Sequence, residues 1–335
     1  MRPRVTTALR EGNKPVLPSL LQAGVDEFAK WWQAKQSAAG MAEKILEPLY
    51  HYTDAGGLKG IVENQEIWFT SVLHLNDPSE INYGIDAAKQ ELRELVNQSG
   101  GNEFLKEFCN HIEFLITHNR HAVFGFFVAS FSRSADELGQ WRAYGDDGRG
   151  FAVGLNPRLF QTTDTPDTTK PEKNVFVASV SYGERNARMK QREALQRAIA
   201  IMQKIVSTKN GRMLMAENET EFNSKMCMEI AVPMLWNSVT TKHDAYAAER
   251  EVRLIILGDL ARFTSIETRV RNGDLVPFVR SCMSTHKEGD IVRVMIGPAA
   301  EPIAEDAVDN LLKTKGIDPV GRVCRSKIPY RSLRR

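Results

Sequence analysis

The chain has 335 residues, of which 42% are apolar, and its charged residues balance to a net charge of +2. This length suits one large domain or two ordinary ones with a substantial core, and the small net charge argues against binding nucleic acid through net charge alone. No run of about 18 apolar residues is present, so no membrane span is expected. The start, Met1-Arg2-Pro3-Arg4, lacks the apolar stretch of a signal peptide, so we expect a cytoplasmic protein.

The cysteines and histidines give no sign of a metal site. No cysteine belongs to a C-x-x-C pair, so isolated reduced thiols are expected at Cys109, Cys227, Cys282 and Cys324. On one helix, His111 and His118 would lie roughly 10 Å apart along the axis, too far to share an ion directly. His118 and His121 could share one, but no third ligand is apparent, so no metal is expected.

The N-terminal part is expected to be an extension, residues 1–46, that carries one peripheral helix. Residues 1–16 are polar, and apolar residues then recur at helical spacing from Leu17 to about Lys35. The core is expected to begin with a strand at Leu49–Thr53, followed by a helix that Asp54 could cap.

Further along the chain, strands and helices mix without strict alternation. A capping box at Ser134–Glu137 is expected to open a short helix through Trp141, and Val123–Phe131 is the most apolar strand and should be central. Helices are expected at about Glu103–His118, Glu184–Thr208, Glu219–Val239 and Glu305–Lys315, after one that starts at Asn76–Glu80. The other strands are expected at Ile67–Ser71, Phe151–Leu155, Val175–Tyr182, Glu251–Leu257, Val292–Ile296 and Gly321–Ser326.

This mixture predicts an α+β fold with a mixed central sheet surrounded by helices. The Thr-, Asp- and Pro-rich stretch Thr162–Lys173 is expected to be an exposed loop, and no clean linker is present. We therefore expect residues 47–331 to form a single elaborated domain.

Common catalytic signatures are absent from the sequence. It contains no G-x-x-x-x-G-K-[ST], G-x-G-x-x-G, G-x-S-x-G or H-E-x-x-H. The absence argues against P-loop enzymes, kinases, Rossmann dehydrogenases, the usual serine hydrolases and zincins.

The polar strand around His51 is the first candidate site. His51 stands among Tyr50, Tyr52 and Thr53, just before the Gly56-Gly57 pair. A strand that ends in polar residues before a glycine turn is a usual place for a ligand to meet the backbone. A histidine that is simply hydrogen-bonded within the fold explains the pattern equally well.

Two further stretches offer candidate residues of weaker specificity. Asn76–Glu80 is explained as a helix start, which leaves Asn76 as the residue that capping does not require. Trp141 and Tyr144 stand three apart on a short helix, where such aromatic residues either pack in a core or form the wall of a pocket for a flat ring.

The charged stretch Glu249-Arg250-Glu251-Val252-Arg253 leads into an apolar strand. In a strand, Glu249, Glu251 and Arg253 would share one face and crowd together where a buried strand begins. A solvated edge is the simple explanation. Paired carboxylates can also stabilise a developing cation, and one of them can act as a general base.

Several motifs together resemble a large bacterial family of uncharacterised domains, over residues 47 to 331. They are Leu49-Tyr-His-Tyr-Thr53, Trp68-Phe-Thr70, Leu75-Asn-Asp-Pro-x-Glu80, Trp141-x-x-Tyr144, Glu249-x-Glu251-x-Arg253 and Ser326-Lys-Ile-Pro-Tyr-Arg331. This resemblance carries little assigned biochemistry.

A strand with His51-x-Thr53, a helix with Gly57-x-x-x-Ile61 and then a strand with the aromatic residues Trp68-Phe69 are more distantly similar to the opening of the ADP-ribosyltransferases. This resemblance carries more biochemistry. It implies a split sheet, NAD as the substrate, His51 holding the ribose, and Trp68 or Phe69 flanking the nicotinamide. It also implies that Glu251 is catalytic, with Glu249 two residues before it. The remaining cofactor-binding residues proposed on this basis or from the patterns above are Tyr52, Thr53, Asn76, Trp141, Tyr144 and Arg253. The expected second-strand tyrosine is absent, and the stretch before Glu251 is long.

Three functions follow as hypotheses. The first is NAD-dependent ADP-ribosyl transfer to an unknown protein or nucleic acid, or hydrolysis of NAD, in a bacterial toxin or phage-defence effector. The second is a non-catalytic nucleotide or nucleic-acid sensor in stress or defence, with Arg142, Arg149 and Arg253 as phosphate contacts. The third is a nuclease that uses Asp77, Glu80 and Glu251. The first hypothesis requires that His51, Trp68 and Glu251 line one pocket, and it fails if Glu251 lies far from His51.

Overall fold

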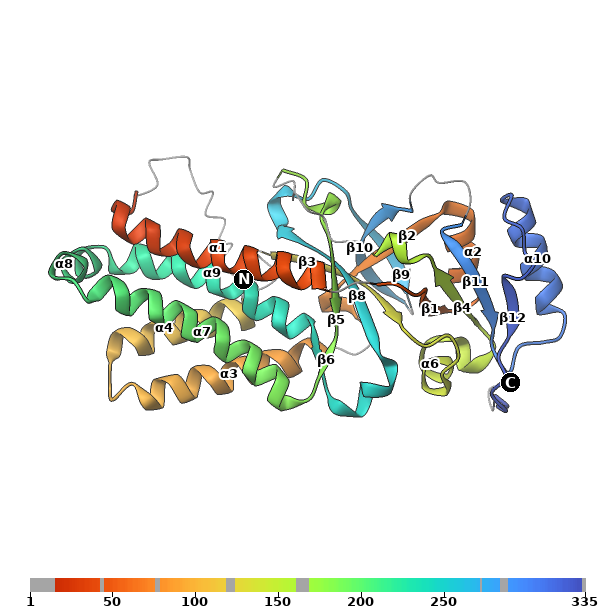
Figure 1. Cartoon of the computed structure of the whole chain (residues 1–335), viewed down its shortest axis with the longest axis horizontal. Coiled ribbons are helices and arrows are strands. Elements are labelled where there is room, and N and C mark those ends of the chain that lie inside the picture. The colour runs from red at the N-terminus through yellow and green to blue at the C-terminus, as the bar shows by residue number, and fades with distance from the viewer. Residues whose placement is uncertain are drawn as a thin grey trace, which may run out of the picture.

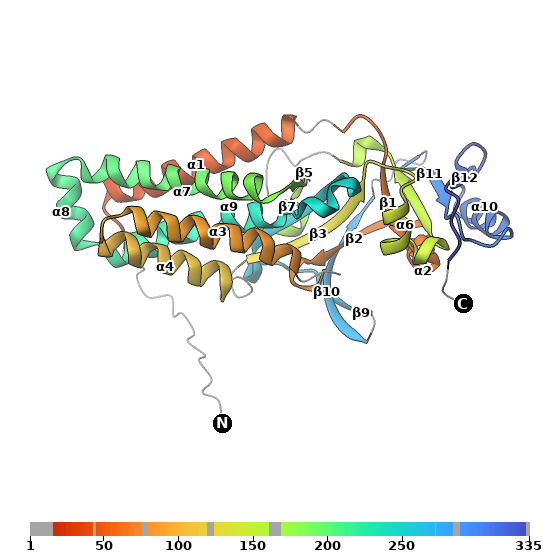
Figure 2. The same cartoon turned by 90° about the horizontal axis from the view of Figure 1, so that it is seen from below.

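The computed structural model describes residues 16–42, 45–75, 79–118, 124–160, 169–271, 273–283 and 289–332. The molecule is elongated, with a bundle of helices at one end and a large sheet that runs from the bundle to the opposite end (Figures 1 and 2). Among the described residues, no helix is long and apolar enough to cross a membrane. Cys109, Cys227 and Cys324 are free thiols, as expected.

The helical bundle packs through apolar faces with helical spacing. Its members are α1 (Ser19–Ala42), α3 (Ser79–Gln98), α4 (Glu103–Thr117), α7 (Glu184–Val206), α8 (Lys209–Glu217) and α9 (Glu219–Val239). Leu21 and Phe28 of α1 are fully buried in the same core as α3, α4, α7 and α9. The N-terminal helix is therefore an integral part of the bundle. α8 was not expected from the sequence; Thr208 starts it by accepting a hydrogen bond from the Gly211 amide.

The main sheet is mixed, so the expected α+β fold with a mixed central sheet is confirmed. Its strands follow the order β12-β11-β4-β1-β3-β2-β10-β9, with β8 paired to β3 and β5 paired to β8. All these pairs are antiparallel except β11 with β12. The strands are β1 (Leu49–Thr53), β2 (Glu66–Ser71), β3 (Phe124–Ser132), β4 (Phe151–Leu155), β5 (Val175–Ser179), β8 (Glu251–Asp259), β9 (Ile266–Arg271), β10 (Asp274–Cys282), β11 (Ile291–Ile296) and β12 (Val323–Arg325).

Two cores lie on the two faces of this sheet. Phe126 and Val128 of β3 face the helical bundle, while Phe127, Ala129 and Phe131 face a second core, as the two-residue period of a strand requires. The second core is covered by α2 (Ala55–Asn64) and α10 (Ala304–Thr314). As expected, Asp54 caps α2: its carboxylate accepts a hydrogen bond from the Gly57 amide at 2.7 Å.

The central position of β3 matches the expectation for the most apolar strand. Three strands, β1, β2 and β8, pair with it. A second, small parallel sheet joins β6 (Ser181–Tyr182) to β7 (Thr241–Lys242) beside the start of β8, where the Glu251 amide donates to the Tyr182 hydroxyl. The start of β8 therefore lies between the main sheet and the bundle, and so do the charged residues that it carries.

The expected capping box at Ser134–Glu137 is wrong. The short helix α6 (Leu138–Tyr144) begins later, and Glu137 is its N-cap, with its carboxylate accepting a hydrogen bond from the Gln140 amide at 2.8 Å. Ser134 instead accepts a hydrogen bond at its carbonyl oxygen from the Tyr52 hydroxyl. α6 packs against β1, where the ring of Trp141 meets that of Tyr52.

Candidate functional site

A gap in the main sheet defines the candidate site. β8 covers one edge of β3 from Phe124 to Ser132. On the other edge, β2 pairs only as far as Val128 and β1 pairs only at Ser132, so Ala129, Ser130 and Phe131 have no strand partner there. A cavity of about 930 Å³ opens at this gap.

The cavity brings together residues from distant parts of the chain. Its walls come from β1 and the start of α2, from β2, from the exposed edge of β3, from α6, from β9, and from the segment before β8. Most of the predicted site residues lie on these walls: His51, Tyr52, Thr53, Trp68, Tyr144, Glu249 and Glu251.

Three other predicted residues, Phe69, Trp141 and Arg253, do not line the cavity. Phe69 is 1% exposed and belongs to the second core, because neighbouring residues of β2 point to opposite faces. Trp141 is fully buried under Tyr52, and its indole Nε1 donates a hydrogen bond to Asp136 at 2.7 Å. Arg253 is 2% exposed and lies behind Glu251. Asn76 lies outside the described residues.

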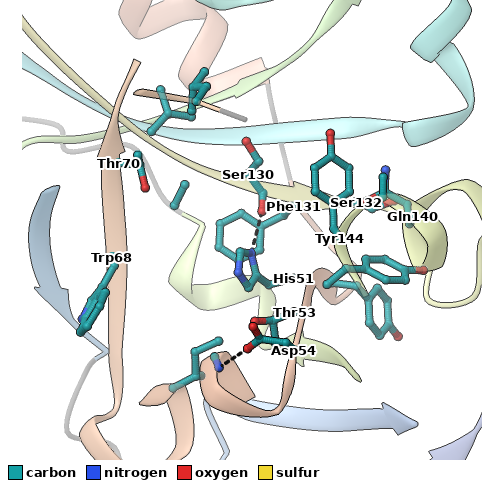
Figure 3. Close-up of a pocket in the computed structure, with 18 of the residues that line it drawn as sticks. His51, Thr53, Asp54, Trp68, Thr70, Ser130, Phe131, Ser132, Gln140 and Tyr144 are labelled. Carbon is teal, nitrogen blue, oxygen red and sulfur yellow. Dashed lines mark hydrogen bonds between the residues drawn. The ribbon is translucent and has the colours of Figure 1, made fainter. Parts of the chain in front are cut away.

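His51 is held against the exposed edge of β3. Its ring Nδ1 donates to the Ser130 carbonyl oxygen at 2.9 Å, and the ring packs beside Phe131 (Figure 3). Burial lowers the pKa of His51, the bond to Ser130 opposes this change, and the nearby Arg269 charge lowers it further. A neutral ring that donates from Nδ1 keeps Nε2 as a hydrogen-bond acceptor.

Tyr52 supports the site through its contacts. Its hydroxyl donates to the Ser134 carbonyl oxygen at 2.9 Å and accepts from the Glu137 amide at 3.1 Å. Its ring meets Trp141 edge-on, with the ring centroids 4.7 Å apart. Burial raises the pKa of Tyr52, so the hydroxyl stays protonated and ties β1 to the start of α6.

Trp68 stands on the opposite side of the gap from His51 (Figure 3). Trp68 is 36% exposed, and its ring lies beside that of Phe278, with the ring centroids 4.5 Å apart. The indole Nε1 donates to Glu66 at 3.2 Å. A supported, partly exposed indole is well suited to stacking a flat ring.

A buried charged cluster closes one end of the cavity. It consists of Glu80 of α3, Lys242 of β7, Glu249, Glu251 and Arg253. The Lys242 ammonium lies 2.8 Å from Glu80, 2.7 Å from Glu249 and 3.5 Å from Glu251. The cluster thus holds three carboxylates and two cations, and all but Arg253 line the cavity.

The two carboxylates predicted to be catalytic have pKa values shifted in opposite directions. For Glu251, burial would raise the pKa, but Arg253 and Lys242 outweigh it and hold the pKa below the ordinary 4.5. For Glu249, burial raises the pKa above 4.5, the neighbouring carboxylates add to this effect, and Lys242 opposes it. Because the two pKa values are shifted apart, Glu251 is suited to remain charged and Glu249 to carry a proton.

Glu249 does not lie on the strand that carries Glu251, contrary to the sequence prediction. It ends the 3-10 helix η5 (Asp244–Glu249), and Arg250 then adopts a left-handed conformation with φ of 48° before β8 begins. Lys242 nevertheless draws Glu249 back toward Glu251. The Tyr144 hydroxyl at the end of α6 lies 3.5 Å from the other oxygen of Glu249.

Several residues of the cavity were not predicted from the sequence. Lys242 is a single lysine with no motif around it, and only the tertiary fold brings it to the glutamates. Ser130 contributes through its position on an unpaired strand edge. Arg269 and Arg271 belong to the hairpin β9–β10, which was missed. The dipeptide Asn272-Gly273 in the sequence is a strong hairpin signal and could have revealed it.

Among the described residues, no group of three or more His, Cys, Asp or Glu side chains is arranged so that it could hold a metal ion. His121 falls outside them. The three carboxylates of the charged cluster are paired with Lys242 and Arg253.

Comparison with known proteins gives one match. No curated protein and no solved structure matches this chain. A family model described as a protein of unknown function (DUF2971) matches residues 140–254. The match includes Tyr144, Lys242 and the Glu249–Arg253 stretch, but neither β1 nor β2. Over residues 140–254, the chain is therefore similar to a family of proteins of unknown function.

Proposed function

We propose that this protein transfers ADP-ribose from NAD to a macromolecule, or hydrolyses NAD. One observation carries the proposal: His51, Trp68, Glu249 and Glu251, which are far apart in the sequence, line one cavity at a gap in the sheet. Its volume, about 930 Å³, lies within the range of about 300–1,000 Å³ that is usual for small-molecule sites.

Each residue has a role that its geometry supports. The Nε2 atom of neutral His51 accepts a hydrogen bond from a ribose hydroxyl. The exposed indole of Trp68 stacks on the nicotinamide ring. Glu251 is held ionised by Arg253, so its negative charge stabilises the cationic ribose that forms as nicotinamide leaves.

The reaction balances without a further reagent. The bond between the ribose C1′ and the nicotinamide nitrogen breaks, and its electron pair leaves with neutral nicotinamide. A nucleophile of the acceptor then forms a bond to C1′ and gives its proton to a base. Glu249 is the candidate base, because its raised pKa lets it take up that proton more readily than Glu251. Water as the nucleophile gives hydrolysis.

The test combines the purified protein, NAD labelled in its adenylate part and bacterial lysate. We expect nicotinamide release, with label in the protein or the nucleic-acid fraction if a macromolecule is the acceptor. Glu251→Gln should abolish both. Glu91→Gln is the matched control, since Glu91 is also buried and paired with arginines but lies outside the cavity. Absence of both products across several lysates would rule the proposal out.

A non-catalytic sensor is the second candidate, and the ion pairs of Glu251 favour it. Arg253 and Lys242 occupy both carboxylate oxygens of Glu251, as in a purely structural cluster. A nucleotide that stabilises the protein and is recovered unchanged would support this alternative. The nuclease hypothesis gains no comparable support, because Glu80 and Glu251 are paired with cations and Asp77 lies outside the described residues.

A further inference from the structure

Arg269 of β9 carries a charge that no carboxylate of the described residues neutralises. Its Nη2 donates to the Thr70 hydroxyl at 2.9 Å, and its Nε is buried with no hydrogen-bond partner among the described residues. The guanidinium lies 5.3 Å from the centre of the Trp68 ring. Burial lowers the pKa of Arg269, and the neighbouring Arg271 lowers it further. Arg269 thus lines the cavity as a partly desolvated cation.

Three other cations near the cavity, Lys242, Arg253 and Arg280, are neutralised by carboxylates. Lys242 and Arg253 contact the glutamates of the charged cluster. Arg280, on the neighbouring strand β10, pairs with Glu267 and lies 3.7 Å from Glu66. Arg271 lines the cavity as well, and its Nη2 donates to the His74 carbonyl oxygen, with no ion pair among the described residues. The cavity therefore has a carboxylate end and an arginine end.

We propose that Arg269, assisted by Arg271, binds the diphosphate of a nucleotide in this cavity. The identification of that nucleotide as NAD rests on the proposed function. A guanidinium offers paired N–H donors that match phosphate oxygens, and a desolvated one gains most from an anion. Arg269 and His51 line the same cavity, and the charge of Arg269 lowers the pKa of the His51 ring. The phosphate site therefore adjoins the ribose site, as the ribose–diphosphate linkage of a nucleotide requires.

Direct binding to the full chain tests this subsite without any need for catalysis. The probes are ADP and inorganic diphosphate, measured by titration calorimetry. Arg269→Gln should raise the Kd for ADP about tenfold or more, because a charge-assisted phosphate contact is lost. Arg280→Gln is the matched control: it removes an arginine from the same face of the sheet, and the Kd should stay within about twofold, because that charge is exposed and already paired.

Thermal unfolding shows whether Arg269→Gln is folded. Two further variants keep the test valid if it is not. Arg269→Lys keeps the charge but loses the paired donors, so it should bind ADP more weakly than the native protein and more tightly than Arg269→Gln. Arg271→Gln should weaken binding less than Arg269→Gln. Native-like affinity in Arg269→Gln, or no binding of ADP by the native protein, overturns the subsite even if NAD is consumed. Binding of ADP that depends on Arg269, without consumption of NAD, leaves the subsite standing and removes the proposed function.

Discussion

Arg253 donates two hydrogen bonds to Glu251, from Nε to Oε1 at 2.7 Å and from Nη2 to Oε2 at 3.0 Å. The same Nη2 also reaches Glu80 of α3 at 2.5 Å, and Nη1 donates to the Val239 carbonyl oxygen at 2.6 Å. Arg253 therefore joins the start of β8 to α3 and to the end of α9. Arg253 also helps Lys242 to hold Glu251 charged, and it adds polar bonds to the apolar contact between the sheet and the bundle.

Loss of Arg253 should destabilise the protein strongly. Arg253→Met leaves Glu251 and Glu80 buried with less compensation, and breaking a buried ion pair in this way costs about 3–5 kcal/mol. Urea unfolding of the native protein and the variant measures the difference in the free energy of unfolding. A loss below about 1 kcal/mol would contradict the view that Arg253 holds the cluster together.

The pKa of His51 should make stability depend on pH. In the folded protein the pKa of His51 is lowered from 6.5. Once the pH falls to about 6.5, the unfolded chain therefore binds more protons than the folded protein, and the stability should fall as the pH drops further. The contribution is at most about 1.4 kcal/mol per pH unit. His51→Asn can keep the hydrogen bond to Ser130 but cannot titrate, so its stability should fall less between about pH 7.5 and pH 5.5. If the stability of the two proteins falls equally with pH, the fold does not lower the pKa of His51.

Substitutions of Trp68 and Trp141 should have different effects, the first on the KM for NAD and the second on thermal stability. Trp68→Ala should raise the KM for NAD roughly 5- to 150-fold, because aromatic stacking on a base contributes about 1–3 kcal/mol. Trp141→Phe should instead lower the thermal stability, since it removes a buried hydrogen bond to Asp136, and should leave the KM nearly unchanged. Steady-state kinetics with thermal unfolding of both variants separates these effects. An unchanged KM in Trp68→Ala would exclude Trp68 from the NAD site.

Glu249→Gln should reduce transfer to an acceptor more than it reduces nicotinamide release. A base is needed to take the proton of the acceptor, whereas the departure of nicotinamide needs the charge of Glu251. The raised pKa of Glu249 also predicts that transfer by the native protein declines as the pH falls toward that pKa, and that the variant lacks this dependence. Equal losses of both activities would remove Glu249 from the role of base.

The sequence predicted the helices and strands of this fold well where the hydrophobic period and the length of a segment indicate the same type of element. The strand at Phe151–Leu155 and the helix at Glu219–Val239 have the bounds that were expected, and β3 is central because it is the most apolar strand. The hairpin β9–β10 was missed because β9 is half exposed and charged, and Pro277 interrupts the apolar run of β10. A charged edge strand lacks the burial that makes a strand recognisable.

The site was only partly predictable, for a related reason. His51, Trp68 and Glu251 could be named because each stands beside residues with a recognisable pattern. Trp141 has an equally suggestive pattern but turns into the core, and periodicity on a helix of seven residues cannot distinguish the two outcomes. The gap between β1 and β2, which creates the cavity, depends on strand pairing that no local pattern encodes.

The rate of nicotinamide release from NAD by the purified chain tests the central proposal most directly. Native protein should release nicotinamide, and Glu251→Gln should lower kcat about a hundredfold or more while the KM changes little, because a charge that acts on the transition state is lost. The control Glu91→Gln should retain the native rate. Native protein that binds NAD and never releases nicotinamide, or a Glu251→Gln variant as fast as the native protein, would contradict the assignment of the cavity as the site of ADP-ribosyl chemistry.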